Sequence, residues 1–408
     1  MPQRTAGVLR SLRIAMAALA AGLVGLAQEK APKPVELSPA GLGTSVAALR
    51  RGAVYLRSRQ DADGSWLQHP AVTALAALAL VQAPAEPPGE FAPAIGKALD
   101  FVVRFAKPDG SIWAEGEGQY PNYSTSICLI ALVAADRVGD REIMRKARAY
   151  LLGPSQFSQV PEGDPSYGGI GYGKSGRPDL SNTQWALEAL YLSQHLDREP
   201  YADNPAQGKQ AELAWGRALT FLTRCQNLAE TNASGWVTSD PENKGGFIYF
   251  PGSTEEDLAP ESKAGEADLK GVKALRSYGS MTYAGLKSMI YAQVKRDDPR
   301  VKAAVDWVRR HYTFKENPGI GAQGHFYYLH TCAKALHTYG EESFADAAGV
   351  SHSWREEMAR ELVALQKADG SWVNEVSGRW MESIPELTTC YALLALEVVA
   401  GRDAVPGR

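Results

Sequence analysis

Basic residues are not in excess in this sequence, which argues against one large class of function. The 43 Lys and Arg residues are outnumbered by 46 Asp and Glu residues, so the formal net charge is -3. Proteins that bind duplex nucleic acid normally neutralise phosphates with a basic domain or stripe. We therefore expect no nucleic-acid partner. With 45% hydrophobic and 22% charged residues, the chain has the profile of a soluble globular protein with a large core.

The N-terminus lacks an apolar run long enough to cross a membrane. Its apolar run, residues 14–27, follows three arginines and ends in Gly25-Leu26-Ala27. This run is short of the roughly 20 residues that a membrane span needs. The pattern is typical of a secretory signal. We predict a signal peptide over residues 1–27, cleavage near Ala27 and export to the periplasm or the extracellular space; an uncleaved anchor is the alternative.

The remaining chain is predicted to hold one domain. Residues 28–43 contain prolines and form a predicted linker, residues 44–400 form the predicted domain, and residues 401–408 form a short tail.

A seven-residue stretch recurs within this domain. Gln366-Lys367-Ala368-Asp369-Gly370-Ser371-Trp372 is nearly repeated at residues 60–66, and a degraded copy occupies residues 107–113. Each copy lies between an amphipathic segment and a small-residue apolar run. We interpret the stretch as a hinge between two helices, with Trp packing on neighbouring helices and Gln capping a helix end.

The apolar runs form a second repeat: Thr, any three residues, Leu or Ala, any residue, Ala or Ser, Leu or Met. Five copies begin at Thr73, Thr125, Thr183, Thr282 and Thr389, and a sixth, at Leu329, keeps only the end of the pattern. An amphipathic segment precedes each copy, as with Leu49, Ala53 and Leu56 before the first. Six such pairs predict an all-α fold, a single (α/α)6 toroid with apolar inner helices and polar-faced outer ones. An open superhelix is the alternative.

Cysteine is scarce, and its positions argue against disulfides. Cys128 and Cys332 occupy the same place in the second and fifth repeats, which stand opposite each other in a six-membered ring. These two therefore cannot pair. We interpret all four cysteines, including Cys225 and Cys390, as small buried hydrophobic residues.

One repeat is much longer than the others. The excess places an insertion at about residues 227–280, whose middle part, 254–270, is acidic and poor in apolar residues. We expect a solvated loop there. A cation site is the alternative, although the spacing of a calcium loop is absent.

All connections from outer to inner helices should lie on one face of the ring, which we call the mouth. The long connections belong to this set, and six inner-helix N-termini converge there. Helix N-termini present unpaired N–H groups and partial positive charge. The mouth is therefore expected to favour an anionic or carbonyl-bearing ligand.

Candidate site residues lie in the mouth loops and at the inner-helix starts. Arg276, Tyr278 and Tyr283 form a polar and aromatic cluster entering an inner helix, where a Tyr or His can do acid/base work on a bound substrate. The predicted catalytic set is Arg276, Tyr278, Tyr283, His325 and His330. The predicted substrate-binding set is Tyr172, Arg177, Asp179, Tyr249, Tyr327, Tyr328, Trp380 and Glu382. The aromatic members either pack the ring or line an apolar ligand cavity.

No cofactor or metal is expected. His325 and His330 are five residues apart and do not share a helical face, and His330 and Cys332 point different ways on a helix. The Gly-rich run at residues 168–173 follows no predicted strand and lacks the G-x-G-x-x-G spacing, so it is interpreted as a tight turn rather than a dinucleotide site.

The Gln-x-x-Asp-Gly-Ser-Trp stretches resemble the QW repeats of squalene-hopene and oxidosqualene cyclases. The six-pair ring is similar to the prenyltransferase/squalene cyclase superfamily, over residues 44–399, and looks most like its exported bacterial single-toroid members. The resemblance implies a polyprenyl or triterpenoid ligand in the ring. The chain departs from the superfamily in lacking the Asp-x-Asp-Asp acid of its cyclases, the Asp-x-Cys zinc ligands of protein prenyltransferases and the Cys-Gly-Glu-Gln thioester motif.

Three hypotheses follow. The chain acts on or holds an isoprenoid lipid in the ring cavity, or it is a non-catalytic binding or scaffold toroid, or it is a Tyr/His/Arg lyase or hydrolase acting on acidic polysaccharide. An apolar, closed, aromatic pocket favours the first, a filled ring the second and an open polar groove with Tyr near Arg the third. Whether the chain is an enzyme stays open; as one, it would be a terpene cyclase/mutase-like isomerase or a transferase.

Overall fold

The computed structural model describes residues 37–116, 120–153, 160–173, 177–198, 201, 206–255, 257–269 and 272–403. The predicted signal peptide and residues 28–36 of the predicted linker lie outside this part. The first described helix begins at Pro39, slightly before the predicted start of the domain at residue 44.

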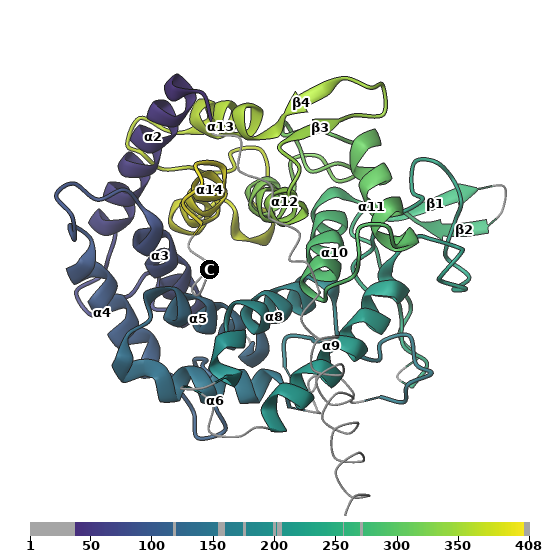
Figure 1. Ribbon diagram of the computed structural model, residues 1–408, viewed down its shortest axis with the longest axis horizontal. Coiled ribbons are helices and arrows are strands. Elements are labelled where there is room, and N and C mark those ends of the chain that lie inside the picture. Colours follow the sequence, from purple (N-terminus) through teal and green to yellow (C-terminus); the bar gives the residue numbers. More distant parts are fainter. Residues whose placement is uncertain are drawn as a thin grey trace, which may run out of the picture. The chain divides into compact units, whose positions relative to one another are not determined.

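Twelve α-helices in the described part alternate between an outer and an inner layer (Figure 1). The outer helices are α2 (Pro39–Ser58), α4 (Ala92–Val103), α6 (Arg141–Leu151), α9 (Ala206–Cys225), α11 (Pro299–Arg310) and α13 (Trp354–Leu365). The inner helices are α3 (Pro70–Gln82), α5 (Pro121–Ala135), α8 (Leu180–Leu192), α10 (Gly279–Tyr291), α12 (His325–Tyr339) and α14 (Pro385–Val399). Short 3-10 turns are η1 (Val138–Asp140), η2 (Gln194–Asp197) and η3 (Arg379–Met381).

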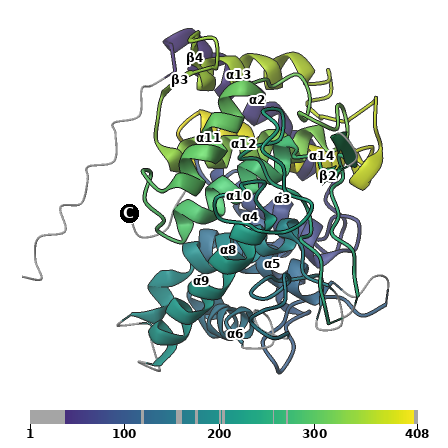
Figure 2. The same ribbon diagram turned by 90° about the vertical axis from the view of Figure 1, so that its right-hand side faces the viewer.

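The inner helices form a closed ring. Each packs against the next in chain order, and the last, α14, packs against the first, α3. In the outer layer, the last helix, α13, contacts the first, α2. This confirms the predicted toroid and excludes the open superhelix. Seen from the side in Figure 2, the helices run between the two faces of the ring.

The repeated Thr has one structural role in all five copies. Its hydroxyl accepts the backbone N–H of a residue in the hinge that precedes the inner helix. The five bonds are Trp66 to Thr73 (3.0 Å), Ile112 to Thr125 (2.8 Å), Ile170 to Thr183 (2.9 Å), Phe247 to Thr282 (3.1 Å) and Trp372 to Thr389 (3.0 Å). A buried N–H without a partner is costly, which explains why the acceptor recurs from repeat to repeat.

The hinge is a clasp between successive repeats, as its sequence indicated. Gln366 donates to Gly370 O inside the hinge and to Ala48 O in α2, and the buried Trp372 donates to Leu362 O. Gln60 makes the same pair of bonds to Gly64 O and to Ala94 O of α4.

The structure contains two further copies of the hinge that do not match the seven-residue sequence pattern. One lies at residues 164–170 and contains Gly168, so the Gly-rich run does form a tight turn there. The other is split: Gln226 donates to Gly245 O, although residues 227–244 of the insertion lie between them in the sequence. The insertion therefore begins inside a hinge.

The insertion folds against the ring. It contains the antiparallel strands β1 (Glu266–Leu269) and β2 (Val272–Leu275), with Glu266 opposite Leu275, and a small core of Trp236, Ile248 and Leu275. Asp164 accepts hydrogen bonds from the Ser253 hydroxyl, from the backbone N–H and the hydroxyl of Thr254, and from the Glu255 N–H. Part of the segment expected to be a solvated loop is thus tied to the ring. A second hairpin, β3 (Ser343–Ala345) and β4 (Ser351–Ser353), precedes α13.

Other expectations have mixed outcomes. The four cysteines are free and buried, as expected. Asp298 caps α11 through the Arg300 N–H. Ser353 and Glu356 have the sequence spacing of a capping box, which predicts reciprocal bonds at the start of α13. That prediction is wrong: Ser353 makes no side-chain cap bond, and Glu356 instead accepts the Ser38 N–H, joining α13 to the start of α2.

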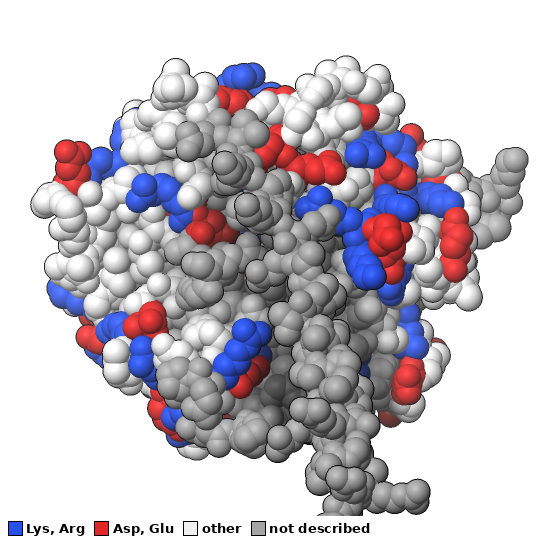
Figure 3. Space-filling view, viewed as in Figure 1, with Lys and Arg blue, Asp and Glu red and all other residues white. Residues whose placement is uncertain are grey.

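The surface carries charges of both signs. On the face viewed in Figure 3, the coloured Lys and Arg atoms lie beside Asp and Glu atoms around the edge. Within the described residues, the helices are not long and apolar enough for any of them to cross a bilayer.

Candidate functional site

Tyrosine side chains meet at the mouth of the ring, over the N-termini of α5, α8, α12 and α14. Tyr172 lies 4.7 Å from Tyr120 and 6.1 Å from Tyr123 between ring centroids, and it hydrogen-bonds Tyr249. Tyr391 continues the contact, as it hydrogen-bonds Tyr123 and meets Tyr327 edge to face at 5.8 Å. We call these six residues the tyrosine cluster: Tyr120, Tyr123, Tyr172, Tyr249, Tyr327 and Tyr391.

Asp179 is the carboxylate of this cluster. It caps α8 by accepting the Asn182 N–H (2.8 Å), it receives a bond from the Asn182 amide (2.6 Å), and it hydrogen-bonds Tyr249. Burial raises the pKa of Asp179 to about 6 despite these donors and the nearby Arg177. Burial, with Asp179 adding to it, raises the pKa of Tyr172 to about 12. The Tyr172 phenol therefore stays neutral at physiological pH.

Two cations beside the tyrosine cluster share one carboxylate. Arg177 and Lys263 both pair with Glu261. Lys263 also lies over the Tyr249 ring at 4.3 Å, and Arg177 lies over the Phe250 ring at 4.7 Å. Glu261 offsets one of these two positive charges, and the nearby Asp179 offsets the other when it is ionised.

Several inner-helix N-termini at the mouth are filled by the chain's own acceptors. Glu382 accepts the Tyr327 N–H at the start of α12 (2.8 Å) and an amide bond from Asn374 (2.7 Å). The side chain of Asn317 accepts the Ser280 N–H at the start of α10 (2.9 Å). Asp179 fills the same role on α8. The helix dipoles are thus partly satisfied internally, which weakens the expectation of an anionic ligand at this face.

The lumen below the mouth is crossed by side chains. His330 of α12 stacks on Trp185 of α8 at 5.3 Å and on Tyr391 of α14 at 5.9 Å. Because α8 and α12 are not neighbours in the ring, this stack passes across the lumen. Tyr327 bridges the same two helices above it, through Ser181 (3.0 Å) and Gln184 (3.2 Å). Burial lowers the pKa of His330 to about 3, so the imidazole is neutral.

A buried ionic layer lies next along the inner helices. Glu188 of α8 pairs with Lys287 of α10 at 2.5 Å and with Lys334 of α12 at 3.5 Å, and Lys334 pairs with Asp403 at 2.7 Å. These four side chains are at most 7% exposed. Burial would raise the pKa of Glu188, but the two lysines lower it to about 2. The lumen is therefore not uniformly apolar.

The predicted catalytic residues are not brought together. Tyr278 is buried at the start of α10, where Tyr327 and Asp179 influence its pKa, so it borders the tyrosine cluster. His330 lies in the lumen. Tyr283 packs edge-on against Tyr328, whose hydroxyl donates to Thr313 O.

His325 stacks on Tyr328 with ring centroids 6.5 Å apart, and its ring nitrogen contacts Phe314 O at 2.8 Å. His325 and Tyr328 therefore face the segment after α11, and Tyr283 packs against Tyr328. The catalytic assignments stay predictions.

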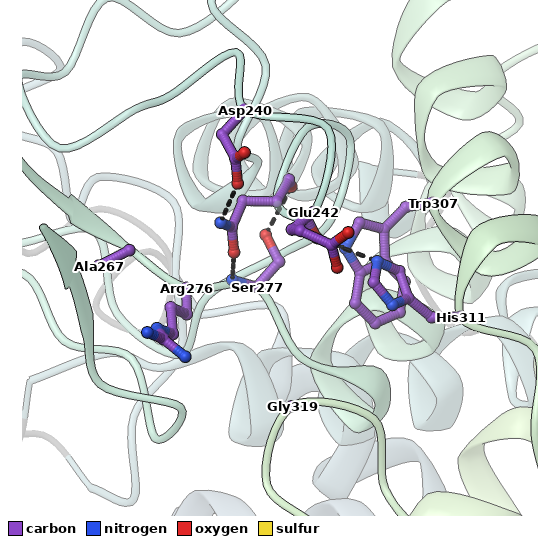
Figure 4. Close-up of a pocket in the computed structure, with 9 residues that line it drawn as sticks. Asp240, Glu242, Ala267, Arg276, Ser277, Trp307, His311 and Gly319 are labelled. Carbon is purple, nitrogen blue, oxygen red and sulfur yellow. Dashed lines mark hydrogen bonds between the residues drawn. The ribbon is translucent and has the colours of Figure 1, made fainter. Parts of the chain in front are cut away.

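Arg276 lines a different hollow, a cavity of about 410 Å³ between the insertion and α11. Figure 4 shows it near Ser277, whose hydroxyl donates to Asn243 O, while Trp307 and His311 contact Glu242 O on the other side. Arg276 itself is exposed and donates to Glu266 O. It is therefore separate from the tyrosine cluster.

Exposed apolar side chains gather at the mouth. Of ten exposed large hydrophobic residues in the described part, six lie on outer-to-inner connections. These six are Leu67, Tyr120, Tyr172, Val376, Trp380 and Met381. Trp380 and Met381 have positive φ angles of 56° and 65°, and the Trp380 ring covers Gly324 at the start of α12. Exposed apolar side chains that gather on one face together with aromatic rings are typical of a binding face.

Sequence reasoning found half of the tyrosine cluster and missed the ionic layer. Tyr172, Tyr249 and Tyr327 were predicted; Tyr120, Tyr123 and Tyr391 were not. A signal was present, since Tyr391 and Trp185 both stand two residues after the repeated Thr and both reach the lumen. Charged residues within apolar inner helices, such as Glu188 and Lys287, were a second signal. In the described part, no three His, Cys, Asp or Glu side chains are placed to hold a metal ion.

No protein-family model matches this chain, and no curated protein matches it. Solved structures with a similar fold include the type II terpene cyclase MstE from Scytonema without ligand, with 14% identity, 88% of this chain and 99% of that chain covered, and a TM-score of 0.53. A variant of that enzyme in complex with geranylgeranyl dihydroxybenzoate matches with 16% identity, 90% and 100% coverage, and a TM-score of 0.51. A glycosidase matches less well, with 15% identity, 90% and 99% coverage and a TM-score of 0.46. At these identities the likeness establishes a terpene-cyclase-like toroid fold and nothing finer.

Proposed function

We propose that this chain is a binding toroid that takes a neutral isoprenoid molecule at its mouth and does not cyclise it inside the lumen. The observation that carries the proposal is the tyrosine cluster, a set of contacting rings of which Tyr120 and Tyr172 are exposed at the mouth, as are Leu67, Val376, Trp380 and Met381. Apolar and aromatic surfaces with a few polar groups are the usual lining of small-molecule sites. The complexed terpene cyclase of the same fold, whose ligand carries a geranylgeranyl group, supports this ligand class.

The polarity of the mouth supports a neutral ligand. Arg177 and Lys263 are both bound to Glu261, and the phenols of Tyr249 and Tyr327 are neutral because burial holds their pKa values high. An acidic polysaccharide would meet the carboxylates of Glu261 and Asp179 beside these two cations. This disfavours the lyase or hydrolase hypothesis.

The lumen supports binding without enclosed cyclisation. A cyclase of this fold needs room for a folded polyene and an acid that protonates it. Here the stack of Trp185, His330 and Tyr391 takes up part of the lumen. Asp179, with a pKa of about 6, is a weak acid for alkene protonation, and it also serves as a helix cap. The non-catalytic hypothesis therefore fits better than the cyclase one.

The proposal predicts that geranylgeraniol binds and that Tyr172→Ala weakens binding about tenfold, since an aromatic contact of this size contributes on the order of 1–2 kcal/mol. Tyr201→Ala is the matched control, because Tyr201 packs on Arg141 and His195 away from the cluster. Binding would be measured by thermal shift and by mass spectrometry of solvent extracts from purified protein.

The outcomes separate the three hypotheses. Equal affinity in the wild type and in Tyr172→Ala would remove the cluster as the site. Absence of any isoprenoid in extracts, with no thermal shift on adding geranylgeraniol, squalene or a hopanoid, would overturn the ligand class. Formation of a cyclised product would replace the binding hypothesis with the cyclase one.

Export is a second part of the proposal. It is supported by the basic and apolar side chains of residues 1–27, which lie outside the described structure. We expect the mature protein from a bacterial host to begin near Gln28 and to be recovered outside the cytoplasm. N-terminal sequencing and cell fractionation would check this; a full-length protein in the cytoplasmic fraction would contradict it.

A further inference from the structure

The ionic layer of the lumen is completed by a residue from the end of the chain. Lys287 and Lys334 bring two positive charges, and Glu188 brings one negative charge, all from inner helices. The second negative charge comes from Asp403, after the last helix has ended. We propose that Lys334 and Lys287 form an anion site held shut by the chain's own C-terminal segment, and that the carboxylate or phosphate of a ligand takes the place of Asp403.

The charge balance supports this. With Asp403 in place, the two lysines face two carboxylates and the layer is neutral. Glu397 does not change the balance, because burial raises its pKa well above the usual range and neither of its carboxyl oxygens has a hydrogen-bond partner. Without Asp403 the layer holds an unpaired buried cation. Such a charge is strongly unfavourable, so the site then favours uptake of an anion.

The segment that delivers Asp403 is held by few contacts. After α14 the chain turns at Gly401, whose φ is 67°. The Arg402 N–H donates to Glu397 O (2.8 Å), and its side chain donates to Gln82 O at the end of α3 (3.1 Å). Asp403 is the first residue beyond this turn to reach the lumen. Backbone bonds outside a regular helix or strand open at a lower free-energy cost than those inside a helix.

Lys287 and Lys334 are held in place mainly by contacts with residues of the inner helices. Lys287 also lies 5.8 Å from the ring of Trp185 and from that of Tyr291, and it is fully buried. Burial would lower the pKa of Lys334, but Asp403 and Glu188 raise it instead. Glu188 is the ninth residue of α8, about 12 Å along the helix from the mouth. Trp185 and His330 lie between this layer and the tyrosine cluster, so the ionic layer and the exposed tyrosines of the mouth are different places on the inner helices.

The first experiment compares Asp403→Asn with the wild type in a phosphate titration at constant ionic strength. We expect the thermal midpoint of the variant to rise by about 2–4 °C between about 1 and 50 mM inorganic phosphate, because an anion now binds only the folded state. The wild type should change by less than about 1 °C over the same range. A double variant, Asp403→Asn with Lys334→Met, restores neutrality and should lose the phosphate response.

A second measurement uses the unmodified chain, so it does not depend on a variant folding. Farnesyl phosphate and inorganic phosphate are added separately, and hydrogen exchange is followed in the peptide that covers residues 397–403. Faster exchange with both probes supports a site for phosphate itself, and faster exchange with farnesyl phosphate alone supports an acidic amphiphile. Unchanged exchange with both, or a phosphate response that persists in the double variant, would overturn the proposal. Geranylgeraniol binding at the mouth is unaffected by either result.

Discussion

Asp179 combines two roles that pull its ionisation in opposite directions. As the cap of α8 it accepts an N–H bond that favours the carboxylate, yet burial among Tyr249 and its neighbours favours the neutral acid. Burial is the larger effect and sets the pKa at about 6. The residue therefore changes charge within the pH range where the tyrosines do not.

This shift predicts a pH dependence of stability. The unfolded chain ionises Asp179 near 3.8, whereas the folded chain holds the proton up to about pH 6. Between these values the folded state binds more protons, so the free energy of unfolding should fall as pH rises from about 4 to 6, by about 3 kcal/mol in total. Asp179→Asn should keep the helix cap and remove this part of the slope. Thermal unfolding from pH 4 to 8 would measure it.

Asp298→Asn is the control, because Asp298 is expected to affect the pH dependence of stability in the opposite direction. Asp298 caps α11, but its hydrogen bonds with Arg300 lower its pKa. Its contribution to the free energy of unfolding is therefore present above pH 4 and lost on acidification. Burial raises the pKa of Glu382 to about 7, so Glu382 also lowers the free energy of unfolding as pH rises, and it does so equally in the wild type and in both variants. Identical slopes for the wild type and Asp179→Asn would contradict the assignment.

The hinge is the element that sets the ring's geometry, and its glycine is the least replaceable position. Gly64, Gly110, Gly168, Gly245 and Gly370 all have φ between 88° and 95°. A Cβ on any of them would lie within 2.6 Å of a carbonyl oxygen of the next outer helix. Only glycine permits both the left-handed turn and this approach.

Gly370→Ala is accordingly predicted to lower the free energy of unfolding by about 2–4 kcal/mol, since its Cβ would meet Arg51 O at 2.6 Å in addition to the backbone strain. Gly96→Ala, in α4 with open space around it, should raise stability by about 0.5–1 kcal/mol. Chemical denaturation of both variants would test the pair. A decrease in the free energy of unfolding of Gly370→Ala no larger than about 0.5 kcal/mol, as for an ordinary surface substitution, would show that the hinge can accommodate a Cβ at this position.

The two hinges missed in the sequence show which features of a structural repeat can be recognised from residue spacing. Copies that keep Gln, Gly and Trp at fixed spacing are visible, because those residues make the same bonds each time. Gln226 and Gly245 make those bonds too, but residues 227–244 lie between them. The hinge is therefore defined by its hydrogen bonds and not by the spacing of its residues in the sequence.

For the whole molecule, ring closure is the property that distinguishes this fold from an open array. The last hinge packs on the first outer helix: Gln366 donates to Ala48 O, just as Gln60 donates to Ala94 O one repeat on. The final repeat thus uses the first as its neighbour, and no terminal repeat in the described part is left uncovered.

The sequence by itself determined the periodic part of this protein. Hydrophobic spacing, the repeated Thr and the hinge glycines act over a few residues or within one repeat, so they specify an all-α toroid and buried, unpaired cysteines. It also indicated part of the mouth, because Tyr172, Tyr249 and Tyr327 lie in the connections that must converge there.

Only the tertiary structure decided what occupies the lumen and which candidates meet. Whether His330 reaches Trp185, or Lys334 reaches Asp403, depends on the rotation of each inner helix and on contacts between residues from distant repeats. The same rotation turns Tyr328 and His325 toward the segment after α11 and leaves Arg276 over another cavity. Such long-range side-chain packing has no local period in the sequence, and it is the reason that the site differs from the set of residues predicted for it.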